Sequence, residues 1–308
     1  MRTIYLGSSA FAVEVLKTLA GSRHRPTLVV TPPDRPKGRG RKLSPPPVAS
    51  LARELDIELV QTPSVNEPGA LAAIERHQPE AICVCEFGQL IKEPLLSRYL
   101  ILNVHPSLLP RWRGATPIER ALMAGDTETG VTIFKITAGL DSGPIALMAR
   151  EAIHPNDTAG TLASRLARTG GELLVEALDQ AEAGELVLVE QTEEGASYAA
   201  KIEPAERQLD PGRSALELER IVRALTPHVG AYLLLEDGGR LGVSAARSGE
   251  GSVPPGELRS ENGLVLGSGE GVLELLEVQP PGRRPMQAAE YLRGHSAAKR
   301  ALGRSNQS

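Results

Sequence analysis

The chain has 308 residues, of which 41% are hydrophobic and 23% charged, and its formal net charge is -4 at pH 7. This composition is typical of a globular protein, and no apolar run approaches the roughly 20 residues that a membrane helix requires. The negative charge excludes nucleic-acid binding through overall charge, although a local cluster of Lys and Arg can still contact phosphates. Because one hydrophobic core rarely fills this length, we expect two domains.

The N-terminal segment does not resemble a secretion signal, because Gly7, Ser8, Ser9 and Glu14 interrupt its apolar residues. We therefore expect a cytoplasmic protein with no membrane partner. Cys83 and Cys85 alternate within a β-rich run, which places both on one face of a strand and prevents an easy mutual disulfide. Both are expected to be buried for structural reasons.

Strand-like and helix-like runs alternate through the first part of the chain. Residues 3–7 precede a helix that Ser8 or Ser9 can cap, whose apolar positions recur at helical spacing. Such alternation predicts an α/β domain with a Rossmann-like open parallel sheet and helices on both faces. Further strands are predicted at 27–31, 57–61, 81–87, 100–105 and 131–136, and further helices at 48–55, 69–77 and 117–125.

The pattern changes in the second part of the chain. An amphipathic helix is predicted over 159–183, and the polar segment that follows has the composition of an interdomain connection. Helices near 216–225 and 287–292 flank apolar runs separated by DGG, ENG and GEG, which are hairpin signals. We expect a small antiparallel barrel or sandwich, with domain boundaries at 1–190, 191–207 (linker) and 208–308.

Two polar side chains end the apolar run 100–105. Asn103 and His105 are two residues apart, so they point to the same side of a strand. The Asn amide can donate to a developing oxyanion, and His can take a proton near neutral pH. The alternative is a capping Asn and a structural His. Asp141 lies in a glycine-flanked turn after 131–136, where it either orients the imidazole or bonds its own backbone.

The sequence lacks the motifs for dinucleotide binding, for a covalent nucleophile and for a metal centre. The segment GSSAFA has no second or third glycine for pyrophosphate, so NAD binding is not expected. No candidate nucleophile accompanies the trio, since Ser107 is not in a GxSxG motif, which favours direct transfer to an external nucleophile. HExxH is absent and the 6 histidines are scattered, so no metal is expected.

The segment NVHPSLLPRWRGATPIERALMAGDTETGVTIFKITAGLDSGPI, residues 103–145, closely resembles the folate-dependent formyltransferases, and most of all the branch that acts on an aminoacyl-tRNA. The family's pattern stands here as Asn103, His105, Ser107 to Pro110, Gly114 and Asp141. SYAAKI, IVRALTP and LEVQPPGRRPM resemble the linker and C-terminal domain of that branch, so the resemblance spans nearly the whole chain and implies an OB-like barrel at its end.

The resemblance implies transfer of the formyl group of 10-formyltetrahydrofolate to the α-amino group of methionyl initiator tRNA. Asn103 would bind the formyl oxygen, His105 would accept the amine proton, and Asp141 would position and polarise His105. The alternative is a formyltransferase for an amino-sugar or ribonucleotide amine. The implied folate-binding residues come from two stretches: Phe87, Gly88 and Leu90 from the first, and Ser107, Leu108, Leu109 and Pro110 from the second.

A basic, glycine- and proline-rich stretch follows the second predicted strand. It resembles the loop that these tRNA enzymes insert into the acceptor stem, and it cannot form a helix. A solvated loop is the alternative. Arg111 and Arg113 could clamp the tRNA end or the folate, and Trp112 could stack there or be a structural plug. We expect a monomer, with tRNA-binding residues Arg35, Lys37, Arg39, Arg41 and Lys42.

Overall fold

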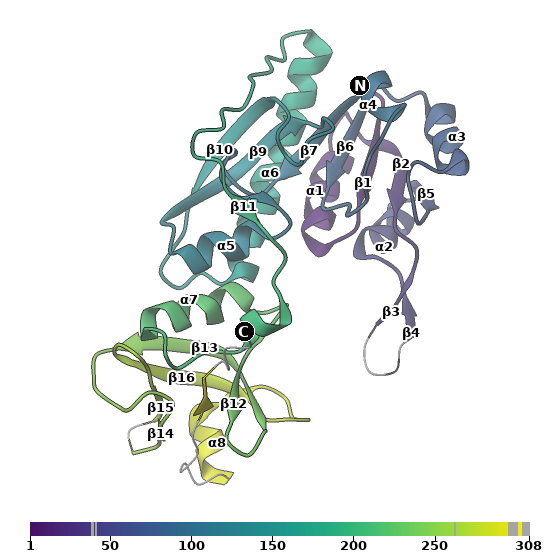
Figure 1. The fold of residues 1–308 in the computed structure, drawn as a ribbon. Helices are drawn as coiled ribbons and strands as arrows, with labels where there is room; N and C mark the ends of the chain where they lie inside the picture. Colours follow the sequence, from purple (N-terminus) through teal and green to yellow (C-terminus); the bar gives the residue numbers. More distant parts are fainter. Residues whose placement is uncertain (38–39, 41, 262, 295–300, 304–308) are drawn as a thin grey trace. The chain divides into compact units, whose positions relative to one another are not determined.

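The computed structural model describes residues 1–37, 40, 42–261, 263–294 and 301–303. The chain divides into two compact units (Figure 1). The first contains 1–117, 128–152 and 163–199, and the second contains 118–127, 153–162 and 200–308.

The first unit is built on a seven-stranded sheet in the order β10-β9-β7-β6-β1-β2-β5. Five neighbouring strands are parallel, and β9 and β10 complete one edge in the antiparallel sense. An antiparallel edge on a parallel sheet is common in α/β folds. The strands are β1 (Thr3–Gly7), β2 (Pro26–Thr31), β5 (Glu58–Gln61), β6 (Ala81–Cys85), β7 (Leu100–His105), β9 (Glu128–Lys135) and β10 (Ile145–Ala152).

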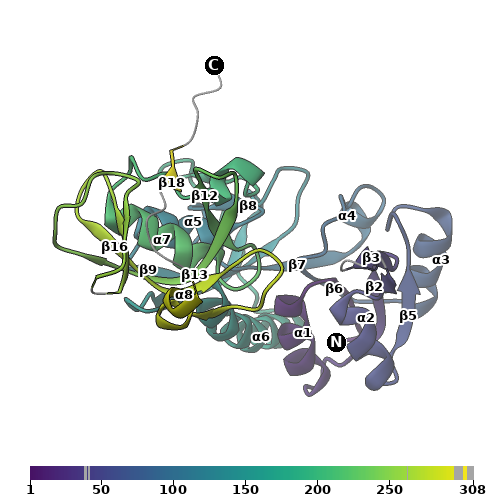
Figure 2. The ribbon, with the colours of Figure 1, turned by 90° about the horizontal axis from the view of Figure 1, so that it is seen from below.

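Helices cover both faces of this sheet, and the alternation of strand residues decides which face each helix covers. Ile4, Ile82 and Ile101 form one buried cluster with residues of α3 and α4. On the opposite face, α6 approaches Val104 so closely that a Cβ on Gly170 would lie 2.7 Å from its Cγ1, and α6 runs beside α1 (Figure 2). The helices are α1 (Ala10–Ala20), α2 (Pro47–Glu54), α3 (Pro68–His77), α4 (Leu95–Arg98) and α6 (Ala159–Ala183).

The first strand-helix turn agrees with the sequence prediction. Ser9 caps α1, its side chain accepting a hydrogen bond from the Ala12 amide, and Phe11, Val15, Leu16 and Leu19 are buried. Cys83 and Cys85 are free and fully buried in β6, as predicted. Burial raises the pKa of the Cys83 thiol to about 12, because no water solvates the thiolate.

A hairpin stands where only a basic loop was expected. Strands β3 (Arg35–Lys37) and β4 (Lys42–Ser44) pair antiparallel, with Arg35 opposite Ser44 and Pro36 opposite Leu43. The hairpin projects from the first unit (Figure 1). Arg39 and Arg41 lie outside the described residues.

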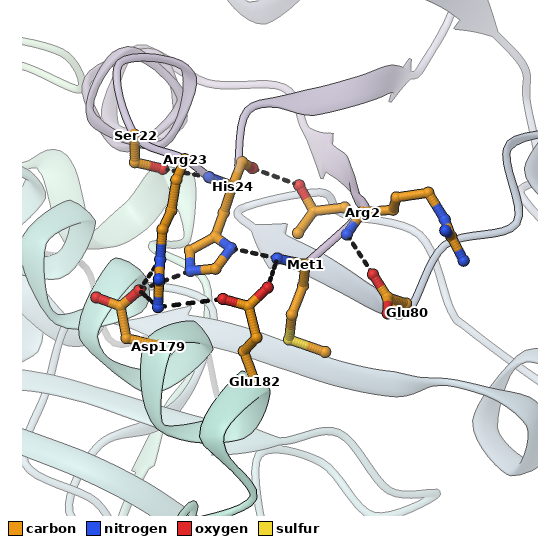
Figure 3. Close-up of polar contacts among 9 residues, drawn as sticks. Met1, Arg2, Ser22, Arg23, His24, Glu80, Asp179 and Glu182 are labelled. Carbon is orange, nitrogen blue, oxygen red and sulfur yellow. Dashed lines mark hydrogen bonds and ion pairs between the residues drawn. The ribbon is translucent and has the colours of Figure 1, made fainter.

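The predicted amphipathic helix 159–183 forms over that full range, as α6. Its C-terminal turns carry Asp179 and Glu182, which contact the start of the chain (Figure 3). The α-amino group of Met1 donates to Glu182 at 2.6 Å and lies 2.7 Å from His24 Nδ1, while His24 Nε2 lies 2.8 Å from Asp179. Arg23 pairs with both carboxylates. This network joins α6 to the residues around β1.

The second unit contains a nearly closed antiparallel β-barrel, with strands in the order β14-β15-β16-β13-β12-β18 and β17 beside β16. The DGG and GEG turns connect successive antiparallel strands, as their hairpin signals predicted. Strands β14 and β15, on either side of ENG, also pair antiparallel, and Asn262 of that signal lies outside the described residues. Its core includes Leu218 and Val222 of α7 with Leu233, Leu266 and Leu273 of the barrel. The strands are β12 (Ala231–Leu235), β13 (Arg240–Gly249), β14 (Leu258–Arg259), β15 (Leu264–Gly267), β16 (Val272–Gln279), β17 (Met286–Gln287) and β18 (Ala301–Leu302).

The described residues of this unit also form a short 3-10 helix, η1 (Pro204–Arg207), and the α-helices α5 (Pro117–Ala124), α7 (Ala215–Leu225) and α8 (Ala288–Gly294). Ser214 and Glu217 form a capping box at the start of α7. The predicted fold class, an α/β Rossmann-like sheet followed by a smaller antiparallel barrel, is confirmed. In the part of the chain that is described, no helix is long and apolar enough to cross a membrane.

Candidate active site

Strand β7 carries Asn103 and His105 at the centre of the first unit. It pairs with β6 on one side and with β9 on the other, where Asn103 lies opposite Phe134 and His105 opposite Thr132. The two polar side chains share the face of Ile101, away from Val104 and α6. Phe134 packs edge-on against the His105 ring, with centroids 6.3 Å apart. The sheet therefore fixes both side chains from a buried strand.

The two ring nitrogen atoms of His105 have different partners. Nε2 lies 2.9 Å from the carbonyl oxygen of Trp112, which can only accept a hydrogen bond, so Nε2 carries the proton of the neutral ring. Nδ1 is then the basic nitrogen, and it lies 3.8 Å from Oδ2 of Asp141. The ring is 4% exposed. Burial lowers the pKa of His105 below its ordinary value, against the smaller raising effects of Asp141 and of the Trp112 carbonyl. His105 is thus a neutral base at pH 7.

Asp141 follows β9, and β9 is not parallel to β7 as the sequence prediction of a parallel sheet had implied. Because β9 is antiparallel to β7, the end of β9 lies beside Leu102 rather than beside His105. The turn after β9 folds back, and Asp141 adopts a left-handed backbone with φ of 46°. Its Oδ2 accepts a hydrogen bond from the Gly114 amide at 2.8 Å. The carboxylate is therefore fixed beside the imidazole.

The Asn103 side chain is half-buried beside this pair. Within the described residues, its carboxamide makes no hydrogen bond to another protein group. An amide that donates to no protein group can donate to a bound oxygen atom without first breaking an internal bond. The structure thus places a free amide donor, a neutral base and a carboxylate in one region.

The segment Trp112–Gly114 supplies the groups that hold His105 and Asp141. Its residues Arg113 and Gly114 form β8, which pairs in parallel with β11 (Tyr198–Ala199). The Trp112 amide donates to the Ser197 hydroxyl at 3.0 Å, and the Arg113 amide to the Ser197 carbonyl at 2.8 Å. Gly114 has φ of 117°, and a Cβ there would lie 2.8 Å from the Ala199 carbonyl, so this close approach requires glycine.

The Ser107–Pro110 stretch follows His105 directly and is fixed by its own hydrogen bonds. The buried Ser107 hydroxyl donates to the Arg111 carbonyl at 2.6 Å. Thr132 of β9 donates to the Ser107 carbonyl and accepts from the Leu109 amide. Leu109 is buried, and the half-buried Leu108 packs against Gly130. The side chains of Ser107 and Leu109 therefore act in shaping the loop.

A pocket of about 400 Å³ opens beyond the carboxyl ends of β1, β2, β5 and β6. Phe87, Gly88 and Leu90, predicted from sequence to bind folate, all line it. Ser107 to Pro110 are not among its lining residues, so the two predicted groups do not share this cavity. Its lining residues also include the cationic residues Arg35 and Lys92.

The predicted basic residues divide into two groups. Arg35 and Lys42 are exposed on the hairpin, as a phosphate contact requires; Lys37 stands at the end of β3.

The expectation that Arg113 could clamp an RNA end or folate is wrong, because its side chain is 2% exposed and bound to Gln191 and Glu193. Trp112 has φ of 63° and carries the Arg111 guanidinium 4.4 Å from its ring centroid.

Sequence reasoning did not assign the roles of three groups in this site. The Trp112 carbonyl and the Gly114 amide are backbone groups, which residue types do not reveal. Gln191 lies in a polar segment whose composition indicates a connection, yet its amide bonds the backbone of the Asp141 turn at 2.8 Å. The family pattern included Gly114 without assigning it a role, but no sequence signal marks Gln191.

His24, Asp179 and Glu182 bring three potential ligand atoms within 4.8 Å of one another. The α-amino group of Met1 and the Arg23 guanidinium already supply positive charge there (Figure 3). A metal ion would have to displace both cations, so these residues are better explained as an ion-pair network.

Comparison with known proteins identifies the class. The pattern of the family described as Formyl transferase matches residues 1–178, and that of Formyl transferase, C-terminal domain, matches residues 201–296. The chain belongs to the formyl transferase family.

Among its relatives, a protein of Methylobacillus flagellatus named methionyl-tRNA formyltransferase is 42% identical over 299 residues, covering 96% of this chain and 97% of the relative. A protein of Paracoccus denitrificans with the same name is 42% identical over 300 residues, covering 96% and 97%.

Solved structures share the fold at much lower identity. WlaRD, a sugar 3N-formyl transferase, has a TM-score of 0.67 at 17% identity, covering 92% of this chain and 99% of that one. A variant of HypX from Aquifex aeolicus has a TM-score of 0.66 at 18% identity, covering 96% of this chain and 48% of that one. At these identities the likeness concerns the fold alone.

Proposed function

We propose that this protein transfers the formyl group of 10-formyltetrahydrofolate to the α-amino group of methionyl initiator tRNA, for translation initiation. The observation that carries the proposal is the basic Nδ1 of a neutral His105, beside Asp141 and on the same strand face as a free Asn103 amide. Relatives named methionyl-tRNA formyltransferase, 42% identical along almost the whole chain, support the acceptor.

The proposed roles follow from the chemistry of formyl transfer, in which the bound folate supplies an activated one-carbon unit. The Asn103 amide donates to the formyl oxygen and holds its charge as the amine nitrogen bonds to the formyl carbon. An α-amino group titrates near pH 8, so part of it is already neutral in the cell. The protein therefore mainly has to orient that amine and remove one proton.

His105 accepts this proton at Nδ1, because Nε2 already carries the hydrogen that it donates to the Trp112 carbonyl. Asp141 then faces the new positive charge from 3.8 Å. When the bond between the formyl carbon and the folate nitrogen breaks, the same imidazolium can return the proton to that leaving nitrogen. His105 thus ends the cycle as it began, and no covalent enzyme intermediate is required.

The folate site is proposed to include Phe87, Gly88, Leu90 and the stretch Ser107 to Pro110. The first three line a pocket of about 400 Å³, a volume in the range of small-molecule sites. The Ser107–Pro110 stretch lies directly after His105, so it can contact a folate whose formyl carbon is near Nδ1. No metal ion is required for this reaction.

The tRNA site is proposed to include Arg35, Lys37, Arg39, Arg41 and Lys42. The strands of the hairpin carry Arg35, Lys37 and Lys42 on a projecting element, where cations can follow a phosphate backbone (Figure 1). Arg39 and Arg41 lie outside the described residues and are proposed from the sequence alone. We propose a catalytic domain of residues 1–190, a linker of 191–207 and a tRNA-binding barrel of 208–308. The barrel region has twelve basic and twelve acidic residues, so any RNA contact there is local. A cytoplasmic monomer fits these roles.

The alternative acceptor, an amino-sugar or ribonucleotide amine, would use the same trio but would not need the basic hairpin. The deciding experiment mixes the protein with 10-formyltetrahydrofolate and methionine-charged initiator or elongator tRNA, and measures formylated aminoacyl product. We expect rapid formylation of the initiator only. Formylation of an amino sugar without formylation of either tRNA would overturn the proposed acceptor.

A further inference from the structure

We infer that Gln191 is a positioning residue that holds the Asp141 turn against His105, which makes the segment Gln191–Ala199 part of the active site as well as a connection. The inference rests on the proposed function for its kinetic consequence, but its structural content concerns Asp141 and His105 alone.

The carboxamide of Gln191 uses its full hydrogen-bonding capacity. Its Nε2 donates to the carbonyl oxygens of Asp141 at 2.8 Å and of Gly143 at 2.7 Å. Its Oε1 accepts from Nε of Arg113 at 3.2 Å and from Nη2 at 3.0 Å. Two acceptors on one side and two donors on the other leave a single orientation of the amide. Gln191 therefore ties the turn to Arg113 in a defined geometry.

Arg113 is a rigid anchor for this bridge. Its side chain is 2% exposed, and its Nη1 binds both carboxylate oxygens of Glu193 at 3.1 and 3.2 Å. Its backbone lies in β8, which pairs with β11. A buried guanidinium with all three nitrogen atoms bonded cannot move without losing those bonds. The hydrogen bonds through Gln191 therefore also limit movement of the Asp141 turn relative to β8.

Three consecutive residues thus hold both members of the proton-transfer pair. Trp112 accepts from Nε2 of His105, Gly114 donates to Oδ2 of Asp141, and Arg113 between them reaches the Asp141 backbone through Gln191. The Asp141 carboxylate is consequently held at its side chain by Gly114 and at its main chain by Gln191. Asp141 has a left-handed backbone, which a residue other than glycine does not favour by itself. Loss of the hydrogen bond from Gln191 to the Asp141 carbonyl therefore frees the turn.

A purely structural Gln191 and a positioning Gln191 predict different results for His105. Among the charged groups of the described chain, Asp141 is the one that raises the pKa of His105, against the dominant lowering by burial. If Gln191 only stabilises the fold, its replacement leaves the titration of His105 in the folded protein unchanged. If Gln191 positions Asp141, its replacement weakens that charge interaction and lowers the pKa of His105 further.

The test uses Gln191→Met, which keeps the length of the side chain and removes all four hydrogen bonds. Gln191→Asn keeps the amide but is too short to reach Arg113 and both carbonyls together. The matched control is Glu190→Gln, at the exposed neighbouring position. The His105 imidazole is titrated by NMR in the full-length protein without substrates, and a His105→Asn variant assigns its signal among the 6 histidines.

We expect a lower His105 pKa in Gln191→Met, a smaller decrease in Gln191→Asn and none in Glu190→Gln. In formyl transfer, kcat of Gln191→Met should fall roughly ten- to hundredfold, with KM for both substrates within about threefold. A His105 titration identical to wild type in folded Gln191→Met and Gln191→Asn overturns the inference. If the wild-type protein does not formylate methionyl-tRNA, the proposed function fails, and the titration still decides the role of Gln191.

Discussion

At the scale of single residues, the site depends on which nitrogen of His105 carries the proton. The bond from Nε2 to the Trp112 carbonyl leaves Nδ1 as the base, and burial keeps that base neutral at pH 7. Asp141 does not form a hydrogen bond to Nδ1 at 3.8 Å, so in the proposed mechanism it acts through its charge after proton transfer. In the proposed mechanism, Asn103 has the separate task of holding the oxyanion.

Replacement of Asn103 tests that task. Because one oxyanion donor contributes about 3 kcal/mol to the transition state, Asn103→Ala should lose roughly a hundredfold or more in kcat. Its KM values should change little, since the donor matters most when the oxygen becomes charged. Steady-state formylation of initiator methionyl-tRNA measures both constants. The control is Asn156→Ala, at an exposed position of the chain. Near-normal turnover in folded Asn103→Ala would exclude this role.

The pH dependence of kcat/KM tests His105. The acceptor amine must be neutral, so log kcat/KM should fall with a slope of one as the pH drops below about 8. Burial lowers the pKa of His105 below the ordinary pKa range of histidine. The slope of log kcat/KM against pH should therefore increase from one to two only at pH values below that range. Log kcat/KM decreases toward low pH because a protonated His105 cannot act as the base. A second break above pH 7, or one that survives in His105→Asn, contradicts the assignment.

Residue types and the family resemblance together predicted Asn103, His105 and Asp141, whereas the expectation for Arg113 was wrong. Asn103, His105 and Asp141 were candidates because an amide, an imidazole and a carboxylate suit oxyanion binding and proton transfer, and the family pattern favoured them over structural roles. Arg113 follows an Arg and the only Trp, which suggested an exposed clamp, yet it is buried as the anchor of Gln191. Its partner comes from a segment about eighty residues later, and one sequence without an alignment contains no signal for that pairing.

At the scale of elements, prediction worked where periodicity was strong. The 25 residues of α6 matched their predicted range, because its apolar positions repeat with helical period. The hairpin of β3 and β4 was not anticipated, since prolines and cations hide its alternation. Nor was the antiparallel direction of β9, because strand direction depends on tertiary pairing rather than on local sequence.

The hairpin supports a prediction of its own. If its cations contact phosphates, Arg39→Ala and Arg41→Ala should each raise KM for tRNA. Each substitution should also lower the slope of log affinity against log salt by about one, because fewer counterions are released. The affinity for folate should stay unchanged. The control is Arg168→Ala, an exposed cation on α6. Equal salt slopes in wild type and both hairpin variants would show that the hairpin makes no phosphate contact.

At the scale of the whole molecule, the two buried thiols report on the integrity of the first unit. Cys83 and Cys85 lie fully buried in β6, in the middle of the sheet, and burial raises the pKa of Cys83 to about 12. Native protein should therefore react with a thiol reagent only as fast as the unit opens, and unfolded protein should react at both cysteines at once. Absorbance after addition of the reagent, with and without denaturant, measures this. Immediate reaction of native protein would contradict the buried β6.

The division into a Rossmann-like unit and a barrel followed from the change of sequence pattern along the chain. Alternating strands and helices predicted the first, and turn signals between apolar runs predicted the second. The contribution of β11 could not be foreseen, because its two residues have no periodicity. Pairing with β8, not sequence preference, makes that segment a strand.

The parallel pairing of β11 with β8 also sets an order of events during synthesis. The ribosome makes Asn103, His105 and Asp141 well before Gln191, Ser197 and Ala199. A nascent chain that ends shortly after α6 would hold all three reactive groups but none of the later partners of Trp112, Arg113 and Gly114. The first unit can therefore acquire its working geometry only after residue 199 has left the exit tunnel.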